Sequence, residues 1–338
     1  MLESLVAPDT QLTLLTASYV RGFFMSSLSV KIKCIEALTP RIRRLVLIAR
    51  DGEQLPDFTP GAHLELHIPG DRKHKRAYSI VNLPAGDHYE IAVQLDDKST
   101  GGSKWVHTLT EGQIIEVEPP RNHFPLVEDA KHILLIAGGI GITPMLGMGR
   151  ALQESKQAFT LHYAGRTAEN MAYLEEVQCL GNSQCWISGG DASKRFAASS
   201  VLASPTEGTH LYICGPVEMI TSVRQTAREL GWPDAHVHYE LFAGALEEDG
   251  DQAFEVELRS SGVTLAVNAG QTLLDVMIEA GLDPMFDCRR GDCGVCVTQM
   301  IEGEADHRDI CLSDRERSGG AFCTCVSRAK TAKLVLDL

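Results

Sequence analysis

The run Cys288-Arg289-Arg290-Gly291-Asp292-Cys293-Gly294-Val295-Cys296 places three cysteines in the spacing C-x4-C-x2-C. This spacing is typical of a plant-type [2Fe–2S] cluster, which also needs a fourth cysteine further along the chain. Glycines inside such a loop let the backbone approach the cluster and donate N–H groups to its sulfurs. A zinc site is the alternative, but zinc ligands usually come as two short C-x2-C or C-x-H elements. The run therefore predicts an iron–sulfur cluster bound by Cys288, Cys293 and Cys296.

Three later cysteines are candidates for the fourth ligand, namely Cys311, Cys323 and Cys325. Cys323 and Cys325 alternate along a predicted strand, so their side chains would point the same way. Spacing alone leaves the choice among the three open. Arg289 and Arg290 in the loop are candidates for docking a partner protein and for raising the cluster potential, and a solvated loop is the alternative.

The composition is that of an ordinary globular protein and excludes several functional classes. The chain has 338 residues, enough for two or three domains, with 44% hydrophobic and 22% charged residues. No apolar run is long enough to span a bilayer. A net charge of −14 without a basic stripe argues against nucleic-acid binding. Because four of the ten cysteines are expected to be thiolate ligands, a reducing cytoplasm is favoured over a disulfide framework.

The chain is expected to begin with an extension, residues 1–24, that lacks fixed structure. Glu3 and Asp9 stand where a signal peptide would carry positive charge, and no small-residue cleavage site is clear. An upstream start codon is the other explanation for this stretch. A first strand is expected soon after Met25.

Residues 25–127 are predicted to form a small antiparallel β-barrel. Short strands such as His63–Ile68, Arg76–Val81 and Glu90–Leu95 are separated by Pro- and Gly-containing turns, with almost no helix.

Residues 128–245 alternate apolar strands with helices, as in Ile133–Ala137 and the helix Val217–Leu230. This alternation predicts a parallel sheet covered on both faces. Residues 246–253 are acidic and are expected to be a linker. Residues 254–338 combine a hairpin, a helix capped by Thr272 and the cluster loop, which predicts a β-grasp ferredoxin domain.

A flavin is indicated by Arg76-Ala77-Tyr78-Ser79 on a predicted barrel strand. Alternation places Arg76 and Tyr78 on one face and Ser79 on the other. A cation beside an aromatic side chain suits the phosphate and the ring of a flavin.

A phosphate cradle is indicated by Gly101-Gly102-Ser103, which precedes a predicted helix at Lys104–Leu109. Asn122 and Phe124 are candidates to complete the flavin pocket. Each feature alone is more often an ordinary loop or core residue, and their order along the chain is what makes the combination specific.

A nucleotide site is indicated by Gly138-Gly139-Ile140-Gly141-Ile142-Thr143-Pro144, which follows a strand and opens a helix. The glycines are expected to admit a pyrophosphate, and Pro144 is expected near the first helical position. Cys214-Gly215-Pro216 ends a second strand, where ligands bind in open parallel sheets. Glu240 and Phe242 close the segment, and Phe242 is expected either to cover the flavin or to pack between domains.

Taken in this order, R-x-Y-S, G-G-S, G-G-I-G-I-T-P-M, C-G-P and the cysteine cluster resemble the phthalate dioxygenase reductase family. The resemblance runs from about residue 28 to 338 and includes the tail Cys325-Val326-Ser327-Arg328-Ala329-Lys330. It implies FMN, NADH and a C-terminal plant-type ferredoxin, and it selects Cys325 as the fourth cluster ligand. It also assigns flavin contacts to Arg76, Tyr78, Ser79, Gly102 and Ser103, and nicotinamide contacts to Gly139, Thr143, Cys214 and Phe242.

The resemblance implies a reductase component of a two-component Rieske-type oxygenase. Hydride would pass from NADH to FMN, and single electrons would then pass through the cluster to the oxygenase. Ser79, Thr143, Cys214 and Phe242 would line the reacting rings. A reductase for a non-Rieske acceptor is the second hypothesis, and a redox sensor, which needs no hydride donor, is the third. Arg166 leaves NADPH open as the donor, and a monomer is expected.

Overall fold

The computed structural model describes residues 27–69, 75–84, 87–97, 101–242, 251–291 and 293–338. The expected extension at residues 1–24 lies outside this range, as does most of the expected linker. Within the described residues, no helix combines the length and apolar character that crossing a bilayer requires.

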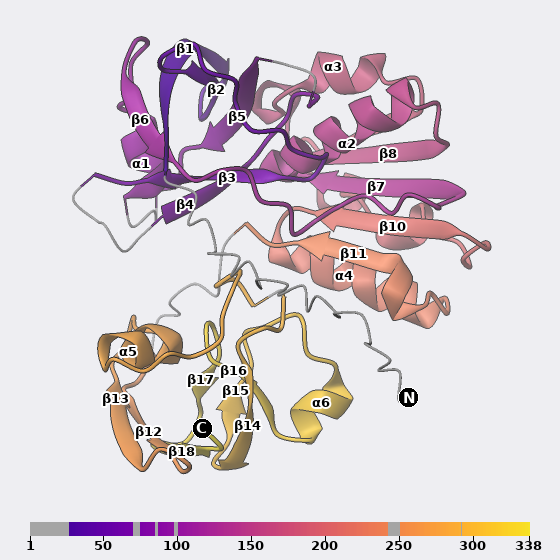
Figure 1. Ribbon diagram of the computed structural model, residues 1–338. Helices are drawn as coiled ribbons and strands as arrows, with labels where there is room; N and C mark the ends of the chain where they lie inside the picture. Colours follow the sequence, from indigo (N-terminus) through magenta and orange to yellow (C-terminus); the bar gives the residue numbers. More distant parts are fainter. Residues whose placement is uncertain (1–26, 70–74, 85–86, 98–100, 243–250, 292) are drawn as a thin grey trace, which may run out of the picture.

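The first part of the chain is a six-stranded antiparallel sheet in the order β4-β3-β6-β1-β2-β5 (Figure 1). A bridge between Ile80, just after β4, and Ile91 in β5 joins the two edge strands and closes the predicted barrel. One short helix, α1 (Gly102–Val106), lies beside it. The strands are β1 (Leu28–Thr39), β2 (Ile42–Ala49), β3 (His63–His67), β4 (Lys75–Ser79), β5 (His88–Gln94) and β6 (Ile114–Val117).

The second part is a five-stranded parallel sheet in the order β11-β10-β7-β8-β9. Helices α2 (Ile142–Glu154) and α3 (Leu174–Cys179) cover one face, and α4 (Val217–Glu229) covers the other (Figure 1). Successive β7 side chains alternate between the two cores, which is why the strand is apolar throughout. The strands are β7 (His132–Gly138), β8 (Phe159–Gly165), β9 (Ser183–Ile187), β10 (Thr209–Cys214) and β11 (Val237–Glu240). Short 3-10 turns are η1 (Gly139–Gly141), η2 (Ala168–Asn170), η3 (Ala192–Lys194), η4 (Ala198–Ser200) and η5 (Asp234–His236).

The third part is a mixed five-stranded sheet in the order β13-β12-β18-β14-β16, with a two-stranded β15-β17 sheet beside it. Thr272 caps α5 (Leu273–Glu279) as predicted, because its hydroxyl accepts the Asp275 N–H at 3.1 Å. The β-grasp prediction is confirmed. The remaining elements are β12 (Phe254–Leu258), β13 (Val263–Val267), β14 (Val297–Glu302), β15 (Ala305–Asp306), α6 (Asp314–Ser318), β16 (Ala321–Cys323), β17 (Arg328–Ala329) and β18 (Lys333–Leu336).

The barrel and the parallel sheet share one hydrophobic core. Barrel residues Ile42 and Val81 pack in the same buried cluster as Met145 and Met148 of α2. At Gly147, an added Cβ would lie 3.2 Å from the Ile80 carbonyl oxygen, so the helix backbone runs directly against the end of the flavin strand. The predicted flavin and nucleotide segments are therefore held side by side.

Candidate functional site

Strand β4 presents the two residues predicted to contact a flavin on one face. Arg76 pairs with Leu66 and Tyr78 with Leu64, and both leucines are fully buried in the barrel. Directly opposed residues share a face, so Arg76 and Tyr78 lie together while Ser79 lies on the other face with His63. Burial raises the pKa of the Tyr78 phenol to about 12, so it stays protonated at neutral pH.

Helix α1 begins at Gly102, two residues before the predicted start at Lys104, and ends at Val106. Gly101 adopts φ +126°, a conformation open to glycine, and a Cβ on Gly102 would lie 2.6 Å from Cγ of Arg76. Among the residues that the structure describes, no side chain caps this helix. The arginine therefore lies against the first turn of this helix, and its guanidinium and the first-turn amides are a donor set that suits a phosphate.

Asn122 and Phe124 hold a neighbouring loop. The Asn122 amide donates to the Thr59 hydroxyl at 2.7 Å and to the Pro60 carbonyl at 2.9 Å, and its oxygen accepts from the Phe124 N–H. Phe124 is buried against Tyr212. A direct contact of either residue with flavin stays a prediction. Ser103 lies at the helix start, where its hydroxyl accepts the Asp96 N–H at 3.1 Å.

The four glycines at the ends of β7 and β10, namely Gly138, Gly139, Gly141 and Gly215, have two different structural roles. A Cβ on Gly141 would lie 2.3 Å from the Cys214 carbonyl oxygen, and one on Gly138 or Gly215 would collide with Met219. These three glycines let the ends of β7 and β10 meet. Only Gly139, at φ +55°, has open space where its Cβ would be, so it is the position that a nucleotide can approach closely.

Alanine substitutions separate these two jobs. We expect Gly141→Ala to destabilise the fold by about 3 kcal/mol, because overpacking costs 1–3 kcal/mol and here the obstacle is backbone. Gly139→Ala costs about 1–2 kcal/mol in backbone strain and chiefly raises the KM for NADH. Thermal midpoints and steady-state kinetics of the two variants check this. Equal loss of stability in both would contradict the division.

The residues predicted to face the nicotinamide differ in exposure. Thr143 is buried, and its hydroxyl donates to the Ile140 carbonyl at 3.0 Å. Cys214 is fully buried at the end of β10, whereas Phe242 is 37% exposed just after β11. Pro144 is the third residue of α2 rather than the first. It is tolerated there because the amides of the first helical turn have no intrahelical partner.

The cluster loop brings its cysteines together. The thiols of Cys288 and Cys293 interact, Cys325 interacts with both Cys288 and Cys296, and the Arg290 N–H donates to Cys288 Sγ at 3.3 Å. The hydrogen bond from the Arg290 N–H to Cys288 Sγ is the kind of backbone contact to a cluster sulfur that the sequence predicted. At Gly291, with φ +79°, a Cβ would lie 2.6 Å from Val326, so the loop packs closely on the chain after Cys325.

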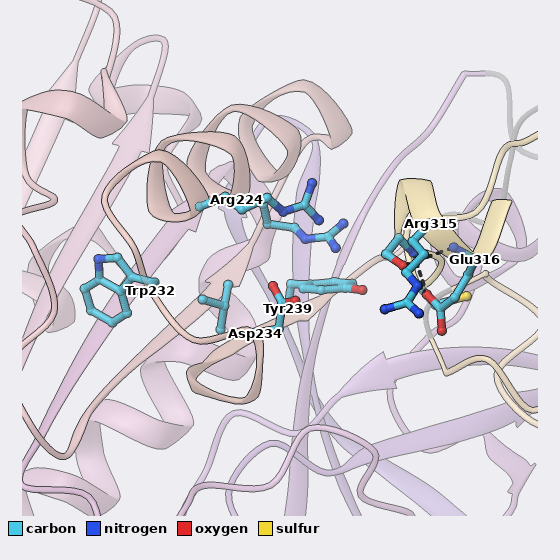
Figure 2. A pocket seen from close by; sticks show the side chains of 10 residues that line it. Arg224, Trp232, Asp234, Tyr239, Arg315 and Glu316 are labelled. Carbon is cyan, nitrogen blue, oxygen red and sulfur yellow. Dashed lines mark hydrogen bonds between the residues drawn. The ribbon is translucent and has the colours of Figure 1, made fainter. Parts of the chain in front are cut away.

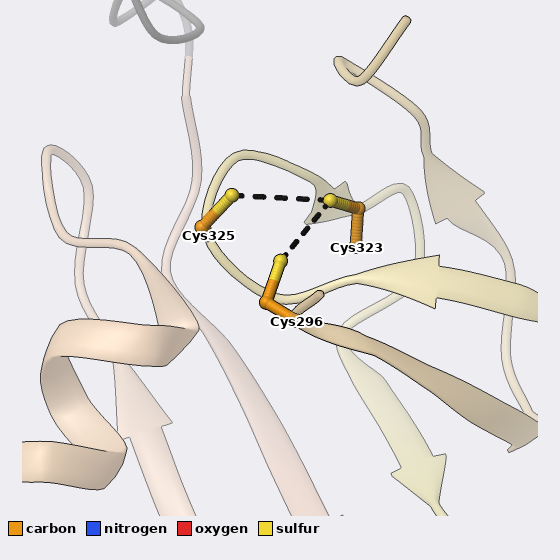
Figure 3. A group of neighbouring side chains, drawn as sticks. All are labelled: Cys296, Cys323 and Cys325. Atoms are coloured by element: carbon orange, nitrogen blue, oxygen red, sulfur yellow. Dashed lines mark hydrogen bonds between the residues drawn. The ribbon is translucent and has the colours of Figure 1, made fainter. Parts of the chain in front are cut away.

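Cys323 and Cys325 do not lie on one strand as predicted. Cys323 ends β16, and Cys325 lies in the turn that follows. Both are nevertheless close to Cys296, and the three sulfurs lie within 4.8 Å of one another (Figure 3). The Cys325 thiol interacts with those of Cys288 and Cys296, whereas the Cys323 thiol lies 3.3 Å from Cys296 Sγ and 3.8 Å from Cys325 Sγ and also interacts with Cys311. The choice of Cys325 as fourth ligand is consistent with this arrangement and stays a prediction.

Arg290 joins the cluster loop to the nucleotide-binding sheet. Its guanidinium lies 3.6 Å from the carboxylate of Glu240 at the end of β11, and the two side chains are 13% and 3% exposed. Asp287, in the same loop, lies 3.3 Å from His123 of the barrel segment. The expectation of a solvated Arg290 is therefore wrong, whereas its roles in docking a partner and raising the cluster potential stay predictions. Arg289 is exposed, pairs with Asp275 at 2.9 Å and stacks on Phe286.

The surroundings of His63 show that the cluster loop lies close to the barrel, because Arg290 acts on this histidine. Burial, together with Arg290, His123 and Arg121, lowers its pKa from 6.5 to about 3. The folded protein thus keeps His63 neutral, while the unfolded chain takes up a proton below pH 6.5. Stability is therefore lost as the pH falls below 6.5.

We expect protonation of His63 in the unfolded chain to lower the free energy of unfolding by about 2 kcal/mol between pH 7.5 and pH 5. The loss is about 1.36 kcal/mol for each pH unit below 6.5. The His63→Gln variant should show a smaller fall in thermal midpoint over that range. The partly exposed His88→Gln variant is the control and should follow the parent protein. Parallel pH profiles for His63→Gln and the parent would contradict the assignment.

A second contact fixes the ferredoxin part against the parallel sheet. The Ile310 carbonyl accepts hydrogen bonds from Arg224 of α4 at 2.7 Å and from the Tyr239 hydroxyl at 2.8 Å. Arg224 also stacks on the Tyr239 ring. A cavity of about 610 Å³ lies beside this contact, between α4 and α6 (Figure 2). Cys311 and Arg315 line it from the ferredoxin side.

Comparisons with known proteins agree with this architecture. Residues 256–330 match the 2Fe-2S iron-sulfur cluster binding domain, and residues 113–237 match the N-terminal domain of dimethylamine monooxygenase subunit DmmA-like proteins. Vanillate O-demethylase oxidoreductase of Pseudomonas sp. (strain HR199 / DSM 7063) is 40% identical over 92% of this chain and all of that protein. The beta subunit of heme-dependent oxidative N-demethylase from Ectopseudomonas mendocina (strain ymp) is 39% identical over 92% of this chain and 99% of that protein.

The structure matches a solved structure of phthalate dioxygenase reductase with a TM-score of 0.74. That protein is described as a modular structure for electron transfer from pyridine nucleotides to [2Fe-2S]. It is 37% identical, and the match covers 93% of this chain and 98% of that one. The chain belongs to the phthalate dioxygenase reductase family. As a member of this family it is an oxidoreductase that takes electrons from a pyridine nucleotide, with FMN and a [2Fe–2S] cluster as its redox groups.

The residues of the present chain fit FMN, a dinucleotide and a [2Fe–2S] cluster. Arg76 and the first-turn amides of α1 suit a phosphate, Gly139 leaves room for a dinucleotide, and the clustered thiols suit iron. Sequence reasoning missed the contacts that orient the three parts, namely His63, His123, Arg224, Tyr239 and the Arg290–Glu240 pair. No local pattern signals them, because each joins residues far apart in the chain.

Proposed function

We propose that this chain is the reductase component that supplies single electrons to a Rieske-type terminal oxygenase. The observation that carries the proposal is the docking of the cluster loop on both other parts of the molecule, through Arg290–Glu240 and His123–Asp287. This loop then lies at the junction of the barrel and the carboxyl end of the parallel sheet. Such fixed placement is what an electron conduit needs and a sensor does not.

Bound FMN supplies the conversion between two-electron hydride chemistry and single-electron transfer, and the [2Fe–2S] cluster carries the single electrons onward. The chain's own residues bind and orient these groups. We assign Arg76 and the Gly101-Gly102-Ser103 turn to the phosphate of FMN, and Tyr78 and Ser79 to its ring. Phe242, exposed beside the sheet edge, would cover the ring until the nicotinamide displaces it.

The nucleotide would bind across the ends of β7 and β10, with its pyrophosphate at Gly139. Thr143 and Cys214 would border the nicotinamide from their buried positions. Arg166 is exposed at the end of β8, where the ribose should lie. We propose NADH as the donor and keep NADPH as the alternative that Arg166 would favour. We also propose domain limits at residues 127, 245 and 253.

Energetics support a Rieske acceptor. Plant-type clusters lie near roughly −400 mV, and Rieske centres lie near roughly −150 mV or above. A drop of about 250 mV corresponds to about four decades in the equilibrium constant for one electron. A haem-containing oxygenase is the second candidate acceptor, because one relative at 39% identity is named as a subunit of a heme-dependent oxidative N-demethylase.

All ten cysteines have free thiols, which supports our proposal of a reducing, cytoplasmic location. We propose a monomer, and size-exclusion chromatography with light scattering tests it.

The test of function is anaerobic titration with NADH followed by the visible spectrum. Flavin and cluster bands should both bleach, and the reduced protein should then reduce a purified Rieske oxygenase in single-turnover mixing. A spectrum without the cluster envelope would overturn the proposal, as would reduction of a haem oxygenase alone.

A further inference from the structure

The fifth thiol at the cluster site, Cys323, has no role in the four-ligand assignment. Its sulfur lies 3.3 Å from Cys296 Sγ and 3.8 Å from Cys325 Sγ (Figure 3). The residue is fully buried. A sulfur so placed is either a ligand itself or a neighbour in direct contact with a ligand.

The position of Cys323 is set by the sheet and not by the cluster loop. It pairs with Val297, the residue after Cys296, in the β14–β16 ladder. The next residue, Thr324, donates from its hydroxyl to the Cys296 carbonyl at 3.1 Å. Cys296 lies in the turn just before β14, so it is held beside Cys323 at the end of β16, and the contact between their sulfurs follows from the register.

The other contacts of Cys323 place it behind the four assigned ligands. The Cys323 thiol also interacts with Cys311, which lines the cavity beside α6, whereas the Cys325 thiol interacts with Cys288 in the loop. Cys288, Cys293, Cys296 and Cys325 form a connected set without it. Cys323 is left as a neutral thiol, which is a weak S–H donor, beside a thiolate ligand, which is an acceptor.

We propose that Cys323 is not a ligand but donates an S–H···S hydrogen bond to the ligating sulfur of Cys296 and thereby raises the reduction potential of the cluster. The inference rests on the proposed [2Fe–2S] site. A hydrogen bond to a ligand sulfur stabilises the reduced cluster more than the oxidised one, because the reduced cluster carries the greater negative charge. A plant-type potential near roughly −400 mV makes reduction by NADH difficult, so the shift is in the useful direction.

The test is a mediated redox titration of the holoprotein, followed by EPR and visible absorbance, with iron and sulfide analysis. Cys323→Val removes the donor at similar volume, and Cys323→Ala removes it with a smaller side chain. Cys323→Ser keeps a donor, and Cys311→Ser is the matched control at the adjacent thiol. We expect Cys323→Val and Cys323→Ala to keep the full iron content. Their equilibrium constant for cluster reduction should fall about three- to tenfold, which is a drop of about 30–60 mV at 59 mV per decade.

Cys323→Ser should lie between these variants and the parent protein, and Cys311→Ser should match the parent. An unchanged potential in Cys323→Val and Cys323→Ala with the cluster intact would overturn the proposal. Loss of the cluster in all three Cys323 variants, with retention in Cys325→Ser, would overturn it differently by making Cys323 the ligand. Absence of a cluster from the anaerobically prepared parent protein would instead refute the underlying function.

Discussion

Replacing Cys325 with serine is expected to yield a folded flavoprotein that has lost its [2Fe–2S] cluster. Cys325 is buried and closes the set of loop thiols through Cys288 and Cys296. Outer-shell partners of metal ligands typically contribute 10–100-fold in affinity, so we expect loss of a ligand to cost roughly hundredfold or more. Reduction of a one-electron acceptor such as cytochrome c should fall by a similar factor. Reduction of ferricyanide, which takes electrons from flavin directly, should persist.

The matched control for this prediction is Cys311→Ser, a nearby half-buried thiol outside the assigned set. It should retain the cluster spectrum and the cytochrome c activity of the parent protein. Iron content, visible absorbance and NADH-dependent activity of both variants provide the measurement. A Cys325→Ser protein with full iron content and an unaltered EPR spectrum would show that another cysteine is the fourth ligand.

Replacing Arg290 with methionine should loosen the cluster loop from the nucleotide-binding sheet. The substitution leaves the Glu240 carboxylate buried without this cation, and breaking a buried ion pair costs about 3–5 kcal/mol. We expect a lower thermal midpoint and slower electron transfer from flavin to cluster, while reduction of the flavin by NADH changes less. Stopped-flow absorbance resolves the two steps.

Arg289→Met offers a matched control, because the same change is made one residue earlier at an exposed ion pair with Asp275. Exposed pairs contribute about 0–1 kcal/mol, so this variant should resemble the parent protein. Adding Glu240→Gln to Arg290→Met removes both charges and should recover part of the lost stability. Equal effects of Arg289→Met and Arg290→Met would refute the role assigned to the buried pair.

Local chemistry explains which parts of the fold the sequence could predict. The hairpin Phe254–Leu258 and Val263–Val267 and the cap at Thr272 depend only on neighbouring residues, and the structure reproduces them. The α1 boundary was wrong because the helix already begins at Gly102, where the lack of a side chain lets it pack closely on Arg76 of β4. The shared strand expected for Cys323 and Cys325 was wrong because β16 ends at Cys323.

The roles of the individual glycines also could not be predicted from local sequence. The run from Gly138 to Gly141 signals a tight turn before a helix, but not which glycine meets the ligand. That distinction depends on Cys214 at the end of β10 and Met219 in α4, which follow β8 and β9 in the chain and pack against Gly141 and Gly138. The predicted contacts of Asn122 and Phe124 likewise depend on a loop around Thr59.

By itself, the sequence determined the class of each part and the chemistry it carries. Cysteine spacing, strand alternation and glycine turns are short-range patterns, and the backbone rules that produce them act within a few residues. Only the tertiary structure decided how the parts meet: Arg290 against Glu240, Ile310 beneath Arg224 and Tyr239, and Cys323 against Cys296. These contacts join residues distant in the chain, and burial and close packing select them only when the whole molecule has folded.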